Sequence, residues 1–158
     1  MTEDPRWPRA GTWLAESTSR LVTSGQQPVF GLLGVPAHET SLSATNAHLT
    51  PQAVREALNR YSTWSHSQQV DLRELAAFDL GDIEAPDGPE GEARTMSALS
   101  SWPGRLLIAL GGDNSITYAV ATGLRATGLV TLDAHHDLRD GISNGSPVQR
   151  LLADGFDG

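Results

Sequence analysis

The chain has 158 residues, a formal net charge of −8 at pH 7 and no cysteine. Without cysteine it forms no disulfide, zinc–thiolate site, iron–sulfur cluster or thiol nucleophile. All 11 basic residues are arginine, which excludes a Schiff-base lysine and the lysine of a phosphate-binding loop. An acidic chain without a visible basic face argues against nucleic-acid or anionic-membrane binding.

The first ten residues are charged and interrupted by prolines, which predicts a loose arm over residues 1–10 at the start of one domain over residues 1–158. This stretch lacks the apolar core of a signal peptide. No apolar run in the chain approaches the length of a membrane-spanning helix. We therefore expect a cytoplasmic protein without a membrane partner.

Strands and helices are predicted to alternate along the chain. Apolar residues at helical spacing predict a first helix over Trp13–Val22, capped by Thr12. Continuous apolar runs predict four buried strands: Pro28–Pro36, Ala76–Asp82, Arg105–Gly112 and Gly128–Leu132. Further helices are predicted from Thr50–Pro51 onward and over Ala93–Leu99, Ser115–Leu124 and Pro147–Ala153. His38–Thr50 and Glu84–Glu92 are expected to be loops. This alternation predicts an α/β fold with a parallel sheet covered by helices.

The segment LDAHHD directly follows the last predicted strand. In an extended chain the alternating Asp133, His135 and Asp137 point to one side. Two carboxylates and an imidazole suit a divalent cation, Mn²⁺ especially, and a cation would offset the repulsion between the acids. We expect a metal site here; the alternative is a solvated acidic turn with incidental histidines. His136 is expected to face away.

Two neighbouring segments carry further polar side chains. In LGGDNS, Asp113 and Asn114 should project at the carboxyl edge of the sheet, where Ser115 can cap the next helix. In SNGSP, Asn144 and Ser146 lie close in sequence to the metal candidates and form a plausible substrate loop. Each segment can also be read as an ordinary turn. Arg139 and Asp140 are expected to form a surface pair.

Together these segments resemble the arginase family, the ureohydrolases that include arginase, agmatinase and formimidoylglutamase. The matching stretches, in family order from about Phe30 to the end, are GVP, LTPQAVREAL, FDLGD, LGGDNSIT, LDAHHD and SNGSPVQRLL. The resemblance implies a three-layer α/β/α sandwich around a parallel sheet. It also implies two Mn²⁺ ions and hydrolysis of a carbon–nitrogen bond in a small guanidino or formimino substrate.

The resemblance also assigns roles to residues. Asp133 would bridge the two metal ions, while Asp137 and His135 would complete their shells, and Asp133 and Asp137 would form the catalytic centre. Asn114 stands where the family's GGDHS motif has a metal-binding histidine, and its amide oxygen can replace that ligand. Asn144 stands where the HG[TS]P motif has a proton-shuttling histidine, and an amide does no acid–base work near neutral pH.

Family members are about twice as long and supply two more carboxylates from an SxDxDxxDP motif that this sequence lacks. The chain therefore resembles the N-terminal half of the family domain. We expect a hydrolase acting on linear amidines, with formimidoylglutamate as the first substrate and agmatine or a guanidino acid next. The alternative is a non-catalytic arginase-like fragment or binding module with an incomplete metal site. An open sheet edge in such a half-domain favours a homo-oligomer.

Overall fold

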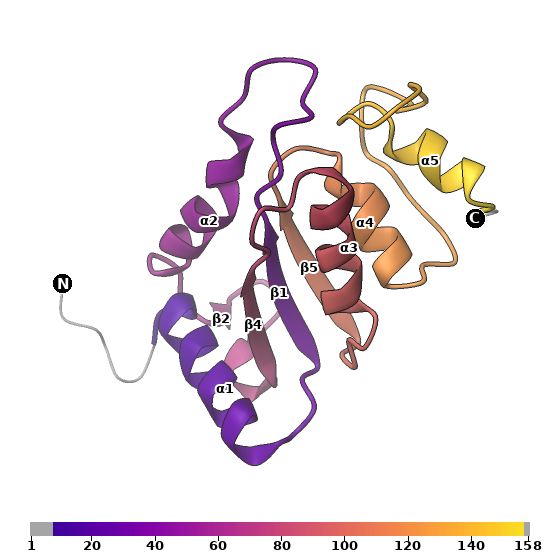
Figure 1. Cartoon of the computed structure of the whole chain (residues 1–158). Helices are drawn as coiled ribbons and strands as arrows, with labels where there is room; N and C mark the ends of the chain where they lie inside the picture. Colours follow the sequence, from indigo (N-terminus) through magenta and orange to yellow (C-terminus); the bar gives the residue numbers. More distant parts are fainter. Residues whose placement is uncertain (1–7, 157–158) are drawn as a thin grey trace. The chain divides into compact units, whose positions relative to one another are not determined.

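The computed structural model describes residues 8–156 and contains a three-stranded parallel sheet of order β4-β1-β5 (Figure 1). The strands are β1 (Phe30–Val35), β4 (Ala77–Asp82) and β5 (Leu106–Gly111). The predicted α/β class with a parallel sheet is confirmed. The chain divides into two compact units; each strand begins in the first unit and ends in the second. Within residues 8–156, no helix is both long enough and apolar enough to cross a bilayer.

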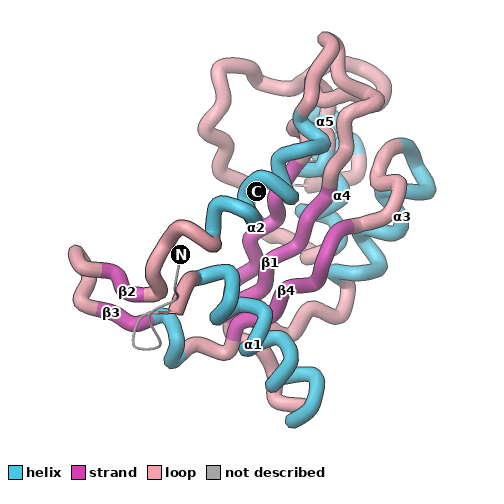
Figure 2. The backbone as a smooth tube through the Cα atoms, turned by 90° about the vertical axis from the view of Figure 1, so that its left-hand side faces the viewer, coloured by secondary structure: helices cyan, strands magenta, loops and turns pink. Residues whose placement is uncertain are grey.

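The first unit comprises residues 8–33, 52–81 and 103–108 of the described part. Its helix α1 (Ala10–Ser24) runs beside β4 (Figure 2) and buries Trp13, Leu14 and Leu21. Two α1 hydroxyls accept hydrogen bonds from the backbone of β4. Ser17 Oγ lies 3.0 Å from the backbone nitrogen of Ala77, and Thr18 Oγ1 lies 2.9 Å from that of Asp79. Apolar contact and hydroxyl bonds together hold α1 against the sheet.

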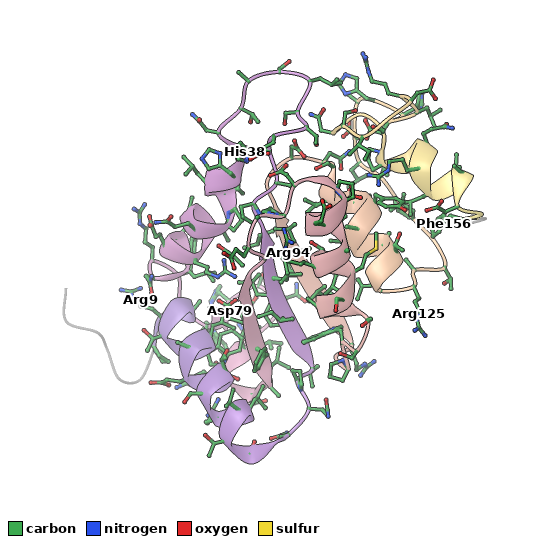
Figure 3. All side chains as sticks on the ribbon, in the orientation of Figure 1. Arg9, His38, Asp79, Arg94, Arg125 and Phe156 are labelled. Carbon is green, nitrogen blue, oxygen red and sulfur yellow. The ribbon has the colours of Figure 1, made fainter. Side chains whose placement is uncertain are left out.

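An ion pair joins helix α2 (Thr50–Leu58) to β4 within the first unit. Arg55 Nε and Nη2 each donate to the carboxylate of Asp79 over 2.8 Å; Asp79 is labelled in Figure 3. Burial acts to raise the pKa of Asp79, but the hydrogen bonds from Arg55 and from the backbone N–H of Gly81 hold that pKa below its ordinary value of 3.8. Asp79 is therefore a structural acid of the sheet.

The rest of the first unit contains short elements that the apolar pattern does not predict. Strands β2 (Trp64–Ser65) and β3 (Val70–Asp71) pair antiparallel and are followed by the 3-10 turn η2 (Leu72–Glu74). The predicted N-terminal arm falls partly outside the described residues, which begin at position 8. Arg9 forms an isolated bridge with Ser62, and α1 already begins at Ala10.

The second unit comprises residues 34–51, 82–102 and 109–156 of the described part. It contains the 3-10 turn η1 (Ala47–Leu49) and three helices: α3 (Gly88–Leu99), α4 (Ile116–Gly123) and α5 (Pro147–Ala153). Helix α4 packs on both α3 and α5. A Cβ on Gly123 would lie 2.9 Å from the Cα of Met96, so the absence of a side chain there lets α4 approach α3 closely. Leu99, Ala119 and Leu151 are buried in this unit.

The strand predicted over Gly128–Leu132 is wrong, because these residues have no regular secondary structure. Val130 is 89% exposed and Leu132 is fully exposed. A strand needs a neighbour that accepts and donates its main-chain hydrogen bonds, and no strand among residues 8–156 pairs with this segment. The apolar sequence of Gly128–Leu132 suits a β-strand. A strand forms only where a neighbouring strand pairs with its backbone.

Helix boundaries also differ from the expectations. Helix α1 is longer than Trp13–Val22, and Arg9 rather than Thr12 occupies its N-cap position. Helix α3 begins inside the expected loop Glu84–Glu92, because a proline in the first turn of a helix loses no hydrogen bond there. Helix α5 spans the predicted residues Pro147–Ala153.

Candidate metal and substrate site

The turn after β5 brings two loops of the second unit into backbone contact. The backbone nitrogen of Gly112 donates to Val35 O over 2.9 Å, and that of Asp113 donates to Ala37 O over 2.9 Å. A Cβ on Gly112 would lie 1.8 Å from Ala37 O, where no side chain fits. Gly112 is therefore required for the chain to pass this close to Ala37 before helix α4 begins.

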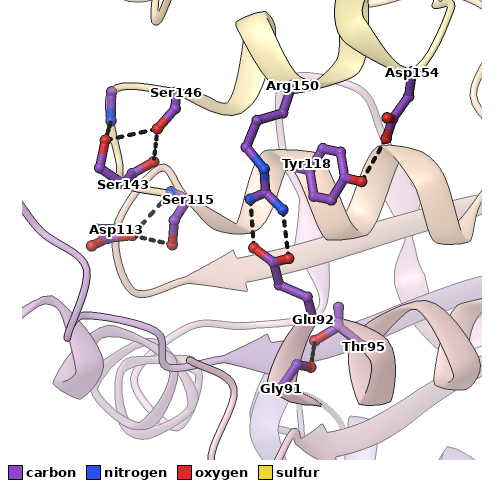
Figure 4. Close-up of polar contacts among 11 residues, drawn as sticks. Gly91, Glu92, Thr95, Asp113, Ser115, Tyr118, Ser143, Ser146, Arg150 and Asp154 are labelled. Carbon is purple, nitrogen blue, oxygen red and sulfur yellow. Dashed lines mark hydrogen bonds and ion pairs between the residues drawn. The ribbon is translucent and has the colours of Figure 1, made fainter. Parts of the chain in front are cut away.

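Asp113 is a structural acid of this turn. Its Oδ1 accepts hydrogen bonds from the backbone nitrogen of Ser115 over 3.0 Å and from the Ser115 hydroxyl over 2.6 Å (Figure 4). Its Oδ2 accepts from the Ser41 hydroxyl. Ser115 occupies the N-cap position of α4, but its side chain accepts no capping bond, which corrects the predicted cap. With both carboxylate oxygens bonded, Asp113 stiffens the turn that carries Asn114.

Asn114 lies against Asp137, although only Asn114 follows a strand of the sheet. Asn114 Nδ2 donates to Asp137 Oδ2 over 2.5 Å, and Asn114 Oδ1 accepts from Thr117 Oγ1 over 2.8 Å. Asp137 is only 8% exposed and has a positive φ of 53°. Its carbonyl oxygen accepts from the backbone nitrogen of Gln149 over 3.1 Å. Asp137 is thus fixed through both its backbone and its side chain.

Asp133 and His135 contact each other at the exposed end of the same segment. The backbone nitrogen of His135 donates to Asp133 Oδ1 over 2.8 Å, and His135 Nδ1 lies 3.3 Å from the same oxygen. The backbone hydrogen bond from His135 holds the pKa of Asp133 below its ordinary value. The side chain of His135 is 83% exposed. With Nδ1 beside Asp133, the opposite ring nitrogen, Nε2, is directed away from that carboxylate.

One cavity of about 700 Å³ in the second unit, called here the site cavity, collects most of the predicted site residues. Five of the six line it: Asn114, Asp133, His135, Asp137 and Asn144. His136 also lines the site cavity, although the extended-chain argument directed it away. The segment is a turn in which Asp133 bonds to the backbone two residues later, so strict alternation does not apply.

The two residues predicted to contact substrate differ in their surroundings. Asn144 lines the site cavity, and its Oδ1 accepts from the backbone nitrogen of Leu42 over 3.1 Å. Ser146 is completely buried, and its hydroxyl lies 2.7 Å from that of Ser143 (Figure 4). In this arrangement Ser146 shapes the loop before α5 and does not line the site cavity.

The donor set of the site cavity fits a hard or borderline divalent cation by type, since it offers carboxylates, imidazoles and an amide. The donor atoms are, however, not arranged around a common point. Within residues 8–156, no three acidic or histidine side chains lie close enough together to hold a metal ion. Asp133 pairs with His135, while Asp137 pairs with Asn114. The donors share one cavity without converging on one point.

Arg139 is exposed, as expected, but it does not form the expected pair with Asp140. It also lines the site cavity. Its backbone nitrogen donates to Gly145 O over 3.0 Å, and its Cδ would lie 3.0 Å from a Cβ on Gly145. The arginine side chain therefore runs over the surface of this glycine. Sequence spacing carried no signal for this contact.

The loop with Asn144 is anchored by helix α5, which carries two polar contacts to its neighbours (Figure 4). Arg150 forms a two-fold ion pair with Glu92 on α3, and its guanidinium carbon lies 3.7 Å from the centre of the Tyr118 ring on α4. Tyr118 donates to Asp154 Oδ2 over 2.6 Å, a bond that raises the pKa of the phenol. These contacts between α3, α4 and α5 hold in place the helix that follows the loop with Asn144.

A model of the arginase family matches residues 29–157. The chain belongs to the arginase family. A formimidoylglutamase from Halalkalibacterium halodurans is 37% identical over 143 residues, which cover 80% of this chain and 44% of that relative. A formimidoylglutamase from Bacillus subtilis is 36% identical over 135 residues, covering 77% of this chain and 42% of the relative. This arginase-family chain therefore spans less than half the length of these relatives and corresponds to their N-terminal part.

Solved structures of the arginase family have the same fold. The crystal structure of the Bacillus subtilis formimidoylglutamase matches 99% of this chain and 51% of its own, with a TM-score of 0.77 and 26% identity. A formiminoglutamase from Trypanosoma cruzi that was solved with Mn²⁺ matches 94% of this chain and 54% of its own, with a TM-score of 0.77 and 24% identity. The arginase-like architecture expected from the motifs is thus confirmed.

Proposed function

We propose that this chain supplies part of the active site of a metal-dependent hydrolase that cleaves a carbon–nitrogen bond in a linear amidine. The observation that carries the proposal is the site cavity. It gathers the carboxylates of Asp133 and Asp137, the imidazole of His135 and the amide of Asn144 from separate family motifs. Relatives that carry the names formimidoylglutamase and agmatinase support the same reaction class.

Asp133, His135 and Asp137 are the residues that would hold Mn²⁺. The ion found in a family structure of the same fold agrees with this donor set. When bound, such an ion supplies a water of lowered pKa. Asp133 offers a carboxylate, and the backbone hydrogen bond from His135 lowers its pKa below the ordinary value. Asp137 is held in place by Asn114, and His135 keeps Nε2 free of the Asp133 contact.

Arg139 favours a substrate that carries a carboxylate. It lines the site cavity and forms no ion pair among residues 8–156, so its guanidinium can bind a carboxylate through two parallel hydrogen bonds. Formimidoylglutamate carries carboxylates beside its formimino group, whereas agmatine carries only cationic groups. Formimidoylglutamate is therefore the first substrate choice, and a guanidino acid is the next. Small anionic amidines are the expected partners, and neither nucleic acid nor membrane enters the proposal.

The second candidate is a non-catalytic arginase-like module. It is favoured by the open donor geometry, in which no three acidic or histidine side chains converge within the described part of the chain. The two candidates differ in metal binding. A hydrolase site closes around Mn²⁺ and uses Asp137 as a ligand. A non-catalytic module binds Mn²⁺ weakly, and its affinity does not depend on Asp137.

Manganese titration followed by electron paramagnetic resonance separates these candidates. Asp137→Ala should weaken Mn²⁺ binding by more than about tenfold, because even residues that only support ligands cost about that much. Asp140→Ala is the matched control, since Asp140 is exposed and does not line the site cavity. Equal binding by wild type and Asp137→Ala would contradict the hydrolase proposal.

The reaction itself is tested by joining this chain to the part of the Bacillus subtilis formimidoylglutamase that follows the matched region. The joined protein should release formamide from formimidoylglutamate faster than urea from agmatine. Arg139→Met should reduce this preference by raising KM for formimidoylglutamate, and Asp133→Ala should abolish both reactions. A preference unchanged by Arg139→Met would contradict the substrate assignment. Cytoplasmic location and homo-oligomerisation stay predictions.

A further inference from the structure

Asn114 forms the middle of a three-residue chain of hydrogen bonds in the second unit. Thr117 Oγ1 donates to Asn114 Oδ1 over 2.8 Å, and Asn114 Nδ2 donates to Asp137 Oδ2 over 2.5 Å. Thr117 lies in the first turn of α4, and its backbone nitrogen also donates to the Asn114 carbonyl over 3.1 Å. The helix start therefore fixes the positions of both residues relative to each other.

The two ends of a carboxamide are not equivalent, because its oxygen only accepts hydrogen bonds and its nitrogen only donates them. A carboxylate also only accepts, so Asp137 takes the NH₂ end of the amide. The Thr117 hydroxyl then donates to the remaining oxygen end and holds it in place. Rotation of the amide by half a turn would place Oδ1 against Asp137 Oδ2 and lose the bond to the carboxylate.

We propose that Thr117 is a positioning residue of the site cavity: by binding Oδ1 it holds the Asn114 amide in the orientation in which its nitrogen donates to Asp137, instead of ligating a metal through oxygen. The proposal deepens the proposed function and depends on it for the role of Asp137. The Asn114 bond occupies Oδ2 of Asp137, while the backbone of Asp137 is held separately by Gln149. Asp137 thereby keeps one carboxylate oxygen, Oδ1, for a ligand or substrate.

The orientation is measured on the metal-free 158-residue chain by the side-chain amide signals of Asn114, which are identified by their loss in Asn114→Ala. In the wild type the charge-assisted bond to Asp137 should shift one amide proton downfield and slow its exchange. Thr117→Val, which keeps the shape and removes the hydroxyl, should weaken both effects, because the oxygen end of the amide is no longer held. Thr117→Ser should restore them. Thr122→Val on the exposed face of the same helix is the matched control and should leave them unchanged.

The consequence for the site is measured separately as Mn²⁺ affinity. Thr117→Val should weaken binding roughly tenfold, as is usual for residues that orient metal ligands, and Thr117→Ser should recover it. In an Asn114→Ala background Thr117→Val should have no further effect, because Thr117 acts through the amide. Dispersed amide spectra of each variant check that it is folded.

The results distinguish failure of this inference from failure of the proposed function. Unchanged Asn114 amide signals in Thr117→Val, or an effect of Thr117→Val that persists in Asn114→Ala, would overturn the positioning role while leaving Mn²⁺ binding by the wild type intact. A wild type that binds no Mn²⁺ while its amide signals respond to Thr117→Val would overturn the proposed function and retain the amide orientation.

Discussion

Arg150 and Glu92 form a two-fold ion pair, in which each Nη of the arginine lies 2.6 Å from a different carboxylate oxygen. The side chains are 18% and 12% exposed, so water screens the pair only in part. The pair joins α5 to α3, and α5 directly follows the loop with Asn144.

Glu92→Gln should lower the free energy of unfolding by about 2 kcal/mol, because it leaves the partly buried guanidinium without its charge partner. Urea unfolding measures the change. Glu90→Gln is the control, since Glu90 lies on the same helix and is exposed. Equal stability of the two variants would show that the pair contributes no net stabilisation.

Asp79 should make the stability of the chain sensitive to acid. Its pKa is lowered in the folded state because Arg55 and the Gly81 N–H outweigh the opposing effect of burial. The pair therefore stabilises the fold above the ordinary Asp pKa of 3.8, and this contribution is lost as the pH falls through the lower folded-state pKa. The stability gap between wild type and Asp79→Asn should be large at pH 7 and shrink below about pH 4. A gap independent of pH would contradict the assignment; Asp140→Asn is the exposed control.

Gly112→Ala should disrupt the turn that carries Asn114. Its Cβ would lie 1.8 Å from Ala37 O, which is backbone and cannot rotate away. We expect a loss of more than about 2 kcal/mol in urea unfolding. Gly128→Ala is the control, because its Cβ meets nothing within 4 Å and Gly128 has no positive φ. Similar losses in both variants would argue against the close approach at Ala37.

The isolated chain should self-associate through its exposed apolar segment. Val130 and Leu132 are 89% and 100% exposed, and both belong to a strand-like sequence without a pairing partner among residues 8–156. Leu132→Ser should lower the association constant in sedimentation experiments and leave unfolding by urea unchanged. Val22→Ser, which removes an exposed apolar side chain from α1, should have little effect. Equal association of both variants would place the interface elsewhere.

The isolated chain with added Mn²⁺ should not release urea or formamide from arginine, agmatine or formimidoylglutamate. Two metal ions held about 3.5–4 Å apart need several carboxylates to offset their repulsion. The DAHHD segment supplies two, Asn114 is neutral, and Asn144 cannot shuttle protons at neutral pH. Metal-dependent turnover that is abolished by Asp133→Ala would prove this prediction wrong.

The sequence alone predicted the elements whose signals are local. The continuous apolar runs predicted the strands β1 and β5, and Ser146–Pro147 predicted the start of α5. Burial holds for β1 but not for β5, where Leu106 and Ile108 are 55% and 42% exposed. Side-chain type and position along the chain were sufficient to predict these elements. The structure also brings Asn114 and Asp137 together, but not through two strand ends, because no strand forms at Gly128–Leu132.

The features that depend on residues distant in sequence were decided only by the tertiary structure. Gly128–Leu132 has a strand's composition, yet it forms no strand because nothing among the described residues pairs with its backbone. Arg139 lies on the site cavity because Gly145 leaves room for its side chain. The Asn114 amide presents its nitrogen to Asp137 because a carboxylate only accepts hydrogen bonds, and the Thr117 hydroxyl holds the amide oxygen. Hydrogen-bond direction and steric space depend on which residues become neighbours in the folded chain. The spacing of residues along the sequence does not reveal these neighbours.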